Sequence, residues 1–198
     1  MKIALLAAVG NPGADYRDTL HNAGVWLVER VAEAHGAVFR EESKWQARIA
    51  TVGDLKLFIP TTFMNQSGRA IAPFARYFRL APEALLVAHD ELDLPVGTVR
   101  FKQGGGLAGH NGLRSVAAEL GARKFNRVRI GVGHPGDKTR VTGHLLGKSR
   151  ASDRDVIDDC IAGVQQALPL ALAGDWQKAM NKLHHQSFGD SAHASEGQ

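Results

Sequence analysis

Short apolar segments alternate with amphipathic stretches along most of this chain, and that alternation limits the possible fold more than any other feature. Residues 2–9 are almost continuously apolar and end in Gly-Asn-Pro-Gly, which is typical of a buried strand followed by a turn. Residues 21–34 carry apolar side chains at helical spacing, and Gly36 follows them as a stop signal. Strands that alternate with helices over short connections predict an α/β fold.

The same alternation continues to the end of the apolar pattern. We expect further strands at residues 48–52, 55–60, 84–88, 98–102 and 127–133. Helices are expected at residues 65–78 and 112–120 and at about 175–185, and another helix is expected to begin at Ser152 as its N-cap. The sequence therefore predicts one α/β domain over residues 1–187, with a mixed, mostly parallel, twisted sheet flanked by helices. The stretch "GDSAHASEGQ" at residues 189–198 lacks an apolar anchor, and we expect residues 188–198 to form a disordered tail.

The composition favours a globular protein of the cytoplasm. A chain of 198 residues suits one compact domain. No apolar run approaches the roughly 20 residues that a membrane-spanning helix needs. The lone Cys160 excludes an internal disulfide and fits a reducing cytosol.

Positive charge is concentrated in one segment of the chain. Residues 97–150 contain eleven Lys or Arg but only Glu119 and Asp137, a local charge of +9 in a chain whose net charge is +4. A face that merely solubilises a protein normally mixes both signs. We therefore favour a polyanion partner, either a nucleic acid or a polyphosphate, over a solubilising face.

The stretch "KQGGGLAGHNG" at residues 102–112 contains a match to G-x-G-x-x-G, the pattern of dinucleotide-binding loops. Such a site needs a buried apolar strand before the glycines and an acidic residue about 20 positions later. Here the preceding strand is half charged, and neither Glu119 nor Asp137 stands at the expected place. The sequence therefore favours a loop whose bare backbone faces a ligand, with a plain tight turn as the alternative.

Polar residues at the ends of the expected strands and helices are the best candidates for chemistry. Asn11 and Asp90 follow two strands, and His21 and Asn65 begin two helices. Ligands collect beyond the carboxyl ends of parallel strands, so these four side chains could meet in one cleft and activate a water molecule. Taken singly, each could instead be a helix cap or a turn residue. We expect no cofactor, because the context of the glycine pattern does not fit a dinucleotide site, and no metal, because "HDELD" lacks close His or Cys spacing.

Along residues 2–187 the chain resembles the bacterial peptidyl-tRNA hydrolase family. The resemblance rests on seven ordered stretches: "VGNPGADY", "HNAG", "PTTFMNQSG", "AHDELDLPVG", "FKQGGGLAGHNGL", "RIGVGHPGD" and "LGK". One departure is Ala8-Val9 before Gly10, where many members carry Gly-Leu, and it concerns strand packing only. The resemblance implies a phosphorylase/hydrolase-like fold, a cytoplasmic monomer and hydrolysis of the ester that joins a peptide to the terminal ribose of tRNA.

Individual roles follow from the matching motifs as implications of this resemblance. His21 resembles the base that deprotonates water, and Asp90 resembles the partner that orients it. Lys102 and Arg129 resemble a cationic pair that holds the 5′-phosphate of the tRNA. The positions that resemble substrate-positioning groups are Asn11, Asn65, Asn111, Tyr16 and Met64.

Two other classes of function remain open from the residues alone. A non-catalytic RNA-binding module would use only the basic segment, and detectable turnover would exclude it. A nicotinamide-dependent enzyme would use the glycine pattern, and a cofactor titration without binding would exclude that.

Overall fold

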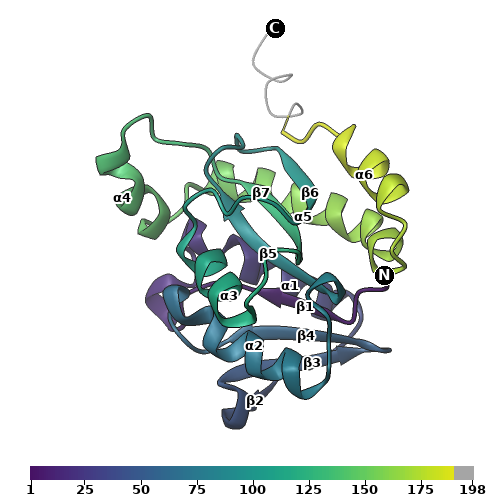
Figure 1. Ribbon diagram of the computed structural model, residues 1–198. Coiled ribbons are helices and arrows are strands. Elements are labelled where there is room, and N and C mark those ends of the chain that lie inside the picture. Colours follow the sequence, from purple (N-terminus) through teal and green to yellow (C-terminus); the bar gives the residue numbers. More distant parts are fainter. Residues whose placement is uncertain (190–198) are drawn as a thin grey trace, which may run out of the picture.

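A single mixed sheet of seven strands organises the protein, whose computed structural model describes residues 1–189 (Figure 1). The strands are β1 (Leu5–Ala8), β2 (Arg40–Glu42), β3 (Ala47–Val52), β4 (Leu55–Pro60), β5 (Leu85–Glu91), β6 (Val99–Gln103) and β7 (Asn126–Gly131). Their order in space is β2-β3-β4-β1-β5-β7-β6. The four central strands are parallel, and antiparallel strands close both edges. This arrangement confirms the predicted α/β domain with its mixed sheet.

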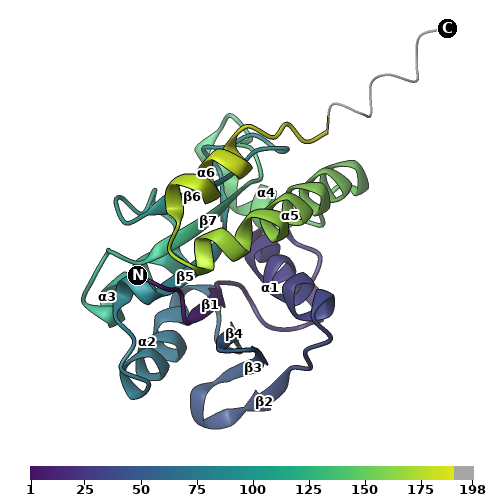
Figure 2. The same cartoon turned by 90° about the vertical axis from the view of Figure 1, so that its right-hand side faces the viewer.

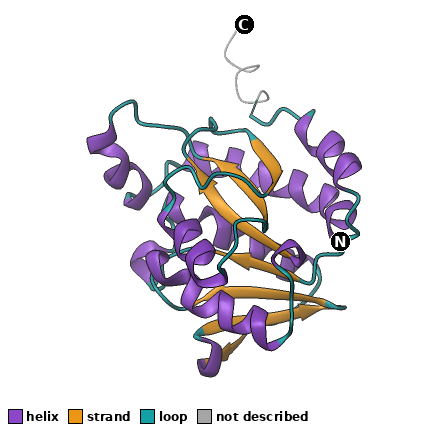
Figure 3. Ribbon diagram, viewed as in Figure 1, coloured by secondary structure: helices purple, strands orange, loops and turns teal. Residues whose placement is uncertain are grey.

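Helices cover both faces of the sheet and make a three-layer molecule (Figures 2 and 3). They are α1 (Ala23–Ala34), α2 (Ser67–Tyr77), α3 (Asn111–Leu120), α4 (Val141–Leu146), α5 (Ala151–Leu172) and α6 (Trp176–His184). Helices α1, α5 and α6 pack on one face, and α2 and α3 pack on the other. Within residues 1–189, no helix combines the length and the apolar character needed to cross a membrane.

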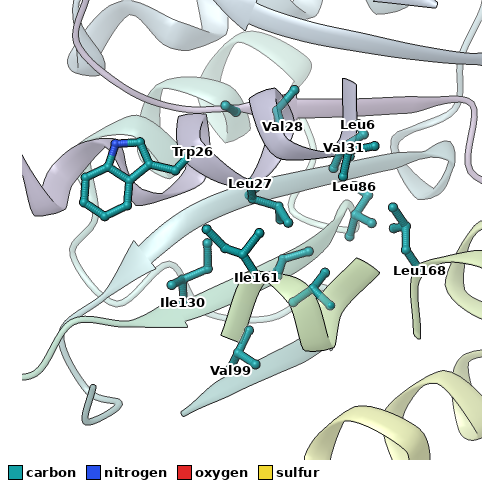
Figure 4. Close-up of a cluster of buried hydrophobic side chains, with 14 of the residues drawn as sticks. Leu6, Trp26, Leu27, Val28, Val31, Leu86, Val99, Ile130, Ile161 and Leu168 are labelled. Carbon is teal, nitrogen blue, oxygen red and sulfur yellow. The ribbon is translucent and has the colours of Figure 1, made fainter. Parts of the chain in front are cut away.

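The alternation of side chains along the buried strands builds two apolar cores, one on each side of the sheet. Leu6 and Leu86 point toward α1 and α5, as Figure 4 shows, whereas Leu5 and Leu85 point toward α2 and α3. Successive side chains on a strand point to opposite faces, so a strand covered on both sides must be apolar throughout. This explains why residues 2–9 read as one continuous apolar run.

Several boundaries differ from the predicted ones. Strand β5 continues past residue 88 to Glu91, because backbone pairing with β7 holds its polar end in the sheet. His21 lies in a 3₁₀ turn at Leu20–Asn22 just before α1, rather than inside the helix. Helix α5 begins at Ala151 with Arg150 as its N-cap, so the predicted Ser152 cap is wrong.

Two elements were not predicted at all. Strand β2 has the sequence Arg-Glu-Glu and is exposed, so it carries no apolar signal. Helix α4 has only six residues. At the other end of the chain, Phe188 packs against the core, while residues 190–198 of the expected tail lie outside the described residues.

Candidate active site

A cleft of about 640 Å³ opens at the carboxyl ends of β1 and β5. Polar residues that follow parallel strands meet at this edge of an α/β sheet, as expected for a ligand site. All seven residues expected to be catalytic or to position the substrate line this cleft: Asn11, Tyr16, His21, Met64, Asn65, Asp90 and Asn111. Helix α4, which the sequence did not reveal, adds Val141, Thr142, Leu145 and Leu146 to the wall.

His21 and Asp90 form the central contact of the cleft. Nδ1 of His21 lies 3.0 Å from Oδ1 and 2.9 Å from Oδ2 of Asp90. The Asp90 side chain is only 1% exposed, and that of His21 is 13% exposed. Burial alone would raise the pKa of Asp90, but hydrogen bonds and favourable charge interactions with His110 and His21 outweigh it and hold that pKa below its ordinary value. Asp90 is therefore an ionised carboxylate, and a neutral His21 that donates Nδ1–H to it keeps its other ring nitrogen unprotonated.

His110 is a third member of this group, and no role was predicted for it. Its Nδ1 accepts hydrogen bonds from the main-chain N–H groups of Gly112 at 3.1 Å and Leu113 at 3.4 Å, so it caps α3. Because Nδ1 accepts, the proton of a neutral ring sits on Nε2, which donates to Oδ1 of Asp90 at 2.8 Å. The signal that could have identified this residue is its place in "GHNG" immediately before a helix.

The same three side chains also have the composition of a metal site, since their ligand atoms all lie within 4.8 Å of one another. A histidine that binds a metal through one nitrogen normally donates a hydrogen bond from the other. In His110 that other nitrogen faces two N–H donors and cannot carry a proton. The arrangement therefore suits a hydrogen-bonded cluster and does not fit metal ligation by His110.

Asn11 is held rigidly by its neighbours. Its Oδ1 accepts from the main-chain N–H of Met64 at 2.8 Å. Its main-chain N–H and C=O both bond to the side chain of Asn22, at 2.8 and 2.9 Å. The amide NH₂ of Asn11 is the polar group that remains to meet a substrate. Asn22, part of "HNAG", is a supporting residue that the sequence did not identify.

The remaining cleft residues form walls and rims. Met64 is buried, and Gly112 leaves room for it, because a Cβ atom at Gly112 would lie 2.5 Å from the Met64 Sδ. Tyr16 meets Phe63 edge-on at 6.2 Å between ring centroids. Asn65 and Asn111 are exposed at the starts of the α2 and α3 regions, where their amides can turn into the cleft.

Lys102 and Arg129 lie beyond the cleft, on the antiparallel pair β6 and β7. In the register of this pair Lys102 stands opposite Arg127, and Arg129 is its diagonal neighbour. Arg129 donates from Nε to Oε2 of Glu91 at 2.9 Å, and Glu91 lines the cleft. The pKa of Lys102 is lowered by desolvation and then by the charges of Arg127 and Arg129. The two predicted cations therefore share one electropositive surface, next to the cleft rather than inside it.

Arg127 organises the glycine loop, a role that the sequence did not predict. It is only 1% exposed, and its guanidinium donates to the carbonyl of Gly106 at 2.7 Å and to that of Gly104. Gly104, Gly105 and Gly109 have positive φ angles, a region that glycine occupies without strain. The loop follows the antiparallel edge strand β6, which is not the place of a dinucleotide-binding loop. Ala108 and Gly109 of this loop line the cleft.

Cys160 lies in the core on α5, away from the cleft. Burial raises the pKa of its thiol to about 12, and the charge of Asp159 adds to the effect. The thiolate needed for nucleophilic chemistry is therefore absent near neutral pH.

Comparisons with known proteins agree on one family. The family model described as "Peptidyl-tRNA hydrolase" matches residues 5–191. The chain is similar to a peptidyl-tRNA hydrolase of Edwardsiella ictaluri, with 49% identity over 189 residues that cover 93% of this chain and 96% of that protein. A Pseudomonas aeruginosa peptidyl-tRNA hydrolase is 46% identical, with 93% and 97% covered. The crystal structure of peptidyl-tRNA hydrolase from Acinetobacter baumannii superposes with a TM-score of 0.90 at 39% identity, covering 93% of this chain and 96% of that one.

Proposed function

The chain belongs to the peptidyl-tRNA hydrolase family and is an ester hydrolase that acts on peptidyl-tRNA, and from this premise we propose that His21 is its general base. Family membership sets aside the non-catalytic RNA-binding module and the nicotinamide-dependent enzyme. The single observation that supports the mechanism best is the contact of His21 Nδ1 with both carboxylate oxygens of Asp90.

In this mechanism the unprotonated nitrogen of His21 accepts a proton from water as that water attacks the ester carbonyl. The buried carboxylate of Asp90 keeps the ring in the required tautomer and stabilises the imidazolium that forms. The imidazolium then returns the proton to the ribose oxygen as the bond between the carbonyl carbon and that oxygen breaks. Free tRNA and a peptide acid result, which would recycle peptidyl-tRNA released early in translation.

The amide groups of the cleft hold the ester in place for this attack. The NH₂ of Asn11 is directed by the hydrogen bond that its Oδ1 accepts from Met64 N–H, so it is the better fixed donor for the developing oxyanion. Asn65 and Asn111 approach from the starts of the α2 and α3 regions and bind the peptide or the terminal ribose. Tyr16 and Met64 supply apolar surface against which the acyl group packs.

The electropositive surface beside the cleft binds the tRNA. Lys102 and Arg129 are two neighbouring cations, and they contact the negatively charged 5′-phosphate. Phosphate contacts position an RNA without reading its sequence. Such contacts suit an enzyme that accepts many tRNAs. We also propose that residues 1–187 form the catalytic domain and that the protein acts as a monomer in the cytoplasm.

The test is hydrolysis of an N-blocked aminoacyl-tRNA by the wild-type protein and by His21→Ala, with and without a chelator. His21→Ala should lose ester cleavage and keep its fold and tRNA affinity. His35→Ala is the matched control, because His35 is exposed at the end of α1 and does not line the cleft. Near-normal turnover by His21→Ala would refute the base assignment, and loss of wild-type activity with chelator would refute the metal-free mechanism.

A further inference from the structure

His89 is a buried histidine that the proposed mechanism does not use. It stands on β5 next to Asp90, and its side chain has no exposure to solvent. Desolvation by burial is the largest cause that lowers the pKa of His89 to about 3; electrostatic interaction with His110 and, more weakly, with Arg127 adds to it, and Asp90 opposes it. The ring is therefore neutral near pH 7.

The hydrogen bond of His89 fixes its tautomer. Nδ1 lies 2.7 Å from the main-chain oxygen of Asp90, and a carbonyl oxygen only accepts, so Nδ1 carries the proton. Nε2 is then a bare acceptor, and it is buried without a hydrogen-bond partner among the described residues. Leaving such an atom unpaired costs about 1–3 kcal/mol, whereas a phenylalanine would fill similar space without that cost. An imidazole at this position thus needs a reason other than packing.

The reason is visible in what the ring touches. His89 meets His110 edge-on, with 5.1 Å between ring centroids and 78° between the ring planes. His110 in turn lies 5.2 Å from His21. Three imidazoles thus surround Asp90: His21 and His110 bond to its carboxylate, and His89 bonds to its carbonyl oxygen.

We propose that His89 is a positioning residue, which holds the peptide plane of Asp90 through Nδ1 and the ring of His110 through its edge, so that the carboxylate faces His21 in the productive orientation. The inference rests on the proposed role of His21 as the base. Misplacing a catalytic group by about 1 Å can cost on the order of a hundredfold in rate, so a residue that fixes this geometry affects kcat rather than substrate binding.

Two substitutions separate the two contacts. His89→Phe keeps a ring against His110 but removes the donor to the Asp90 carbonyl. His89→Asn keeps an amide donor near the Nδ1 position but removes the ring edge. The control is Asn126→Leu, which removes a buried side chain that bonds to Glu83 and Leu85 carbonyls at the far end of the same strand pair.

The experiment measures kcat and KM on N-blocked aminoacyl-tRNA, scaled to the folded fraction, and the ¹H NMR signal of the His21 Nδ1 proton. We expect His89→Phe to lower kcat about tenfold, to leave KM nearly unchanged and to shift the signal of the His21 Nδ1 proton. In His89→Asn the loss of kcat should be smaller, because the donor to the Asp90 carbonyl is kept. Asn126→Leu should lower the melting temperature and leave kcat and the signal alone.

Wild-type kcat and an unshifted signal in both His89 variants would overturn the inference, as would an equal loss of kcat in Asn126→Leu. If His89→Phe does not fold, His89→Asn decides by the same two readouts, since its loss of the ring contact should then lower kcat. Activity in His21→Ala would instead refute the proposed function, so the two failures are distinguishable.

Discussion

The carboxylate of Asp90 bonds to His21 through both of its oxygens, at 3.0 and 2.9 Å from the same Nδ1 atom. An amide in this place has only one oxygen. In either orientation the NH₂ of an asparagine would lie beside the Nδ1–H of His21, so one of the two acceptor contacts would become a contact between two donors and the Nδ1–H tautomer would be less favoured.

Asp90→Asn should therefore abolish most of the activity although it changes hardly any volume. We expect kcat to fall by about a hundredfold or more, as when an orienting carboxylate is lost elsewhere. Hydrolysis of N-blocked aminoacyl-tRNA measures the loss, and circular dichroism checks that the fold remains. A variant with wild-type kcat would show that His21 does not need the carboxylate.

Stability should depend on pH through His89. Its pKa is about 3 in the folded protein against an ordinary 6.5, so between these values the unfolded chain binds more protons than the folded one. The contribution of His89 to the free energy of unfolding is therefore fully present above pH 6.5. It falls by about 1.4 kcal/mol for each pH unit below that value, down to about pH 3.

Urea unfolding at a series of pH values tests this slope, with His89→Phe as the comparison. The variant should lose the contribution of this group, and its stability should fall less steeply between pH 6 and pH 4 than that of the wild type, over the range set by the His89 pKa. Identical slopes in the two proteins would mean that His89 does not titrate as its burial requires.

Lys102→Ala and Arg129→Ala should weaken binding of the whole tRNA more than the chemistry. Each removes one cation beside the cleft, so the slope of log K against log salt should fall by about 1 in magnitude, and KM should rise. Both variants should hydrolyse a minimal aminoacyl-nucleotide ester, which lacks the 5′-phosphate, at the wild-type rate. Equal losses on the full and the minimal substrate would argue against a phosphate contact.

Gly112→Ala should disturb the cleft through Met64. A Cβ atom there would lie 2.5 Å from the Met64 Sδ and 3.0 Å from Val9, so the methionine must move. We expect a loss of severalfold in kcat/KM and a destabilisation of about 1–3 kcal/mol. Gly106→Ala is the control, because nothing lies within 4 Å of a Cβ at that position and its φ is not positive. Equal effects of the two substitutions would contradict this role of Gly112.

The fold was predictable where the apolar pattern and the hydrogen-bonded strand coincide. Strand β4 (Leu55–Pro60) has the predicted bounds, because the positive-φ Gly53 turns the chain between two alternating segments. The end of β5 was missed, since His89, Asp90 and Glu91 are polar although they pair with β7. Hydropathy describes which side chains are buried in apolar surroundings and says nothing of backbone pairing that continues beyond them.

The site was predictable only in part for a similar reason. His21 and Asp90 were identified by resemblance and by their places at the ends of elements, and the structure brings them together. The roles of His110 and His89 can be recognised only from hydrogen bonds and ring contacts between segments that are distant in the sequence. Arg127 was unpredictable, because arginine is almost never fully buried and no local pattern marks an exception.

Arg127 also sets the polarity of the glycine loop. It draws the carbonyl oxygens of Gly104 and Gly106 toward the interior of the protein. Since the N–H of the next residue lies in the same flat peptide unit and points the opposite way, the amides of Gly105 and Leu107 point away from the Arg127 guanidinium. A buried cation thereby fixes the orientation of two peptide units in a loop whose glycines have no side chains to do so.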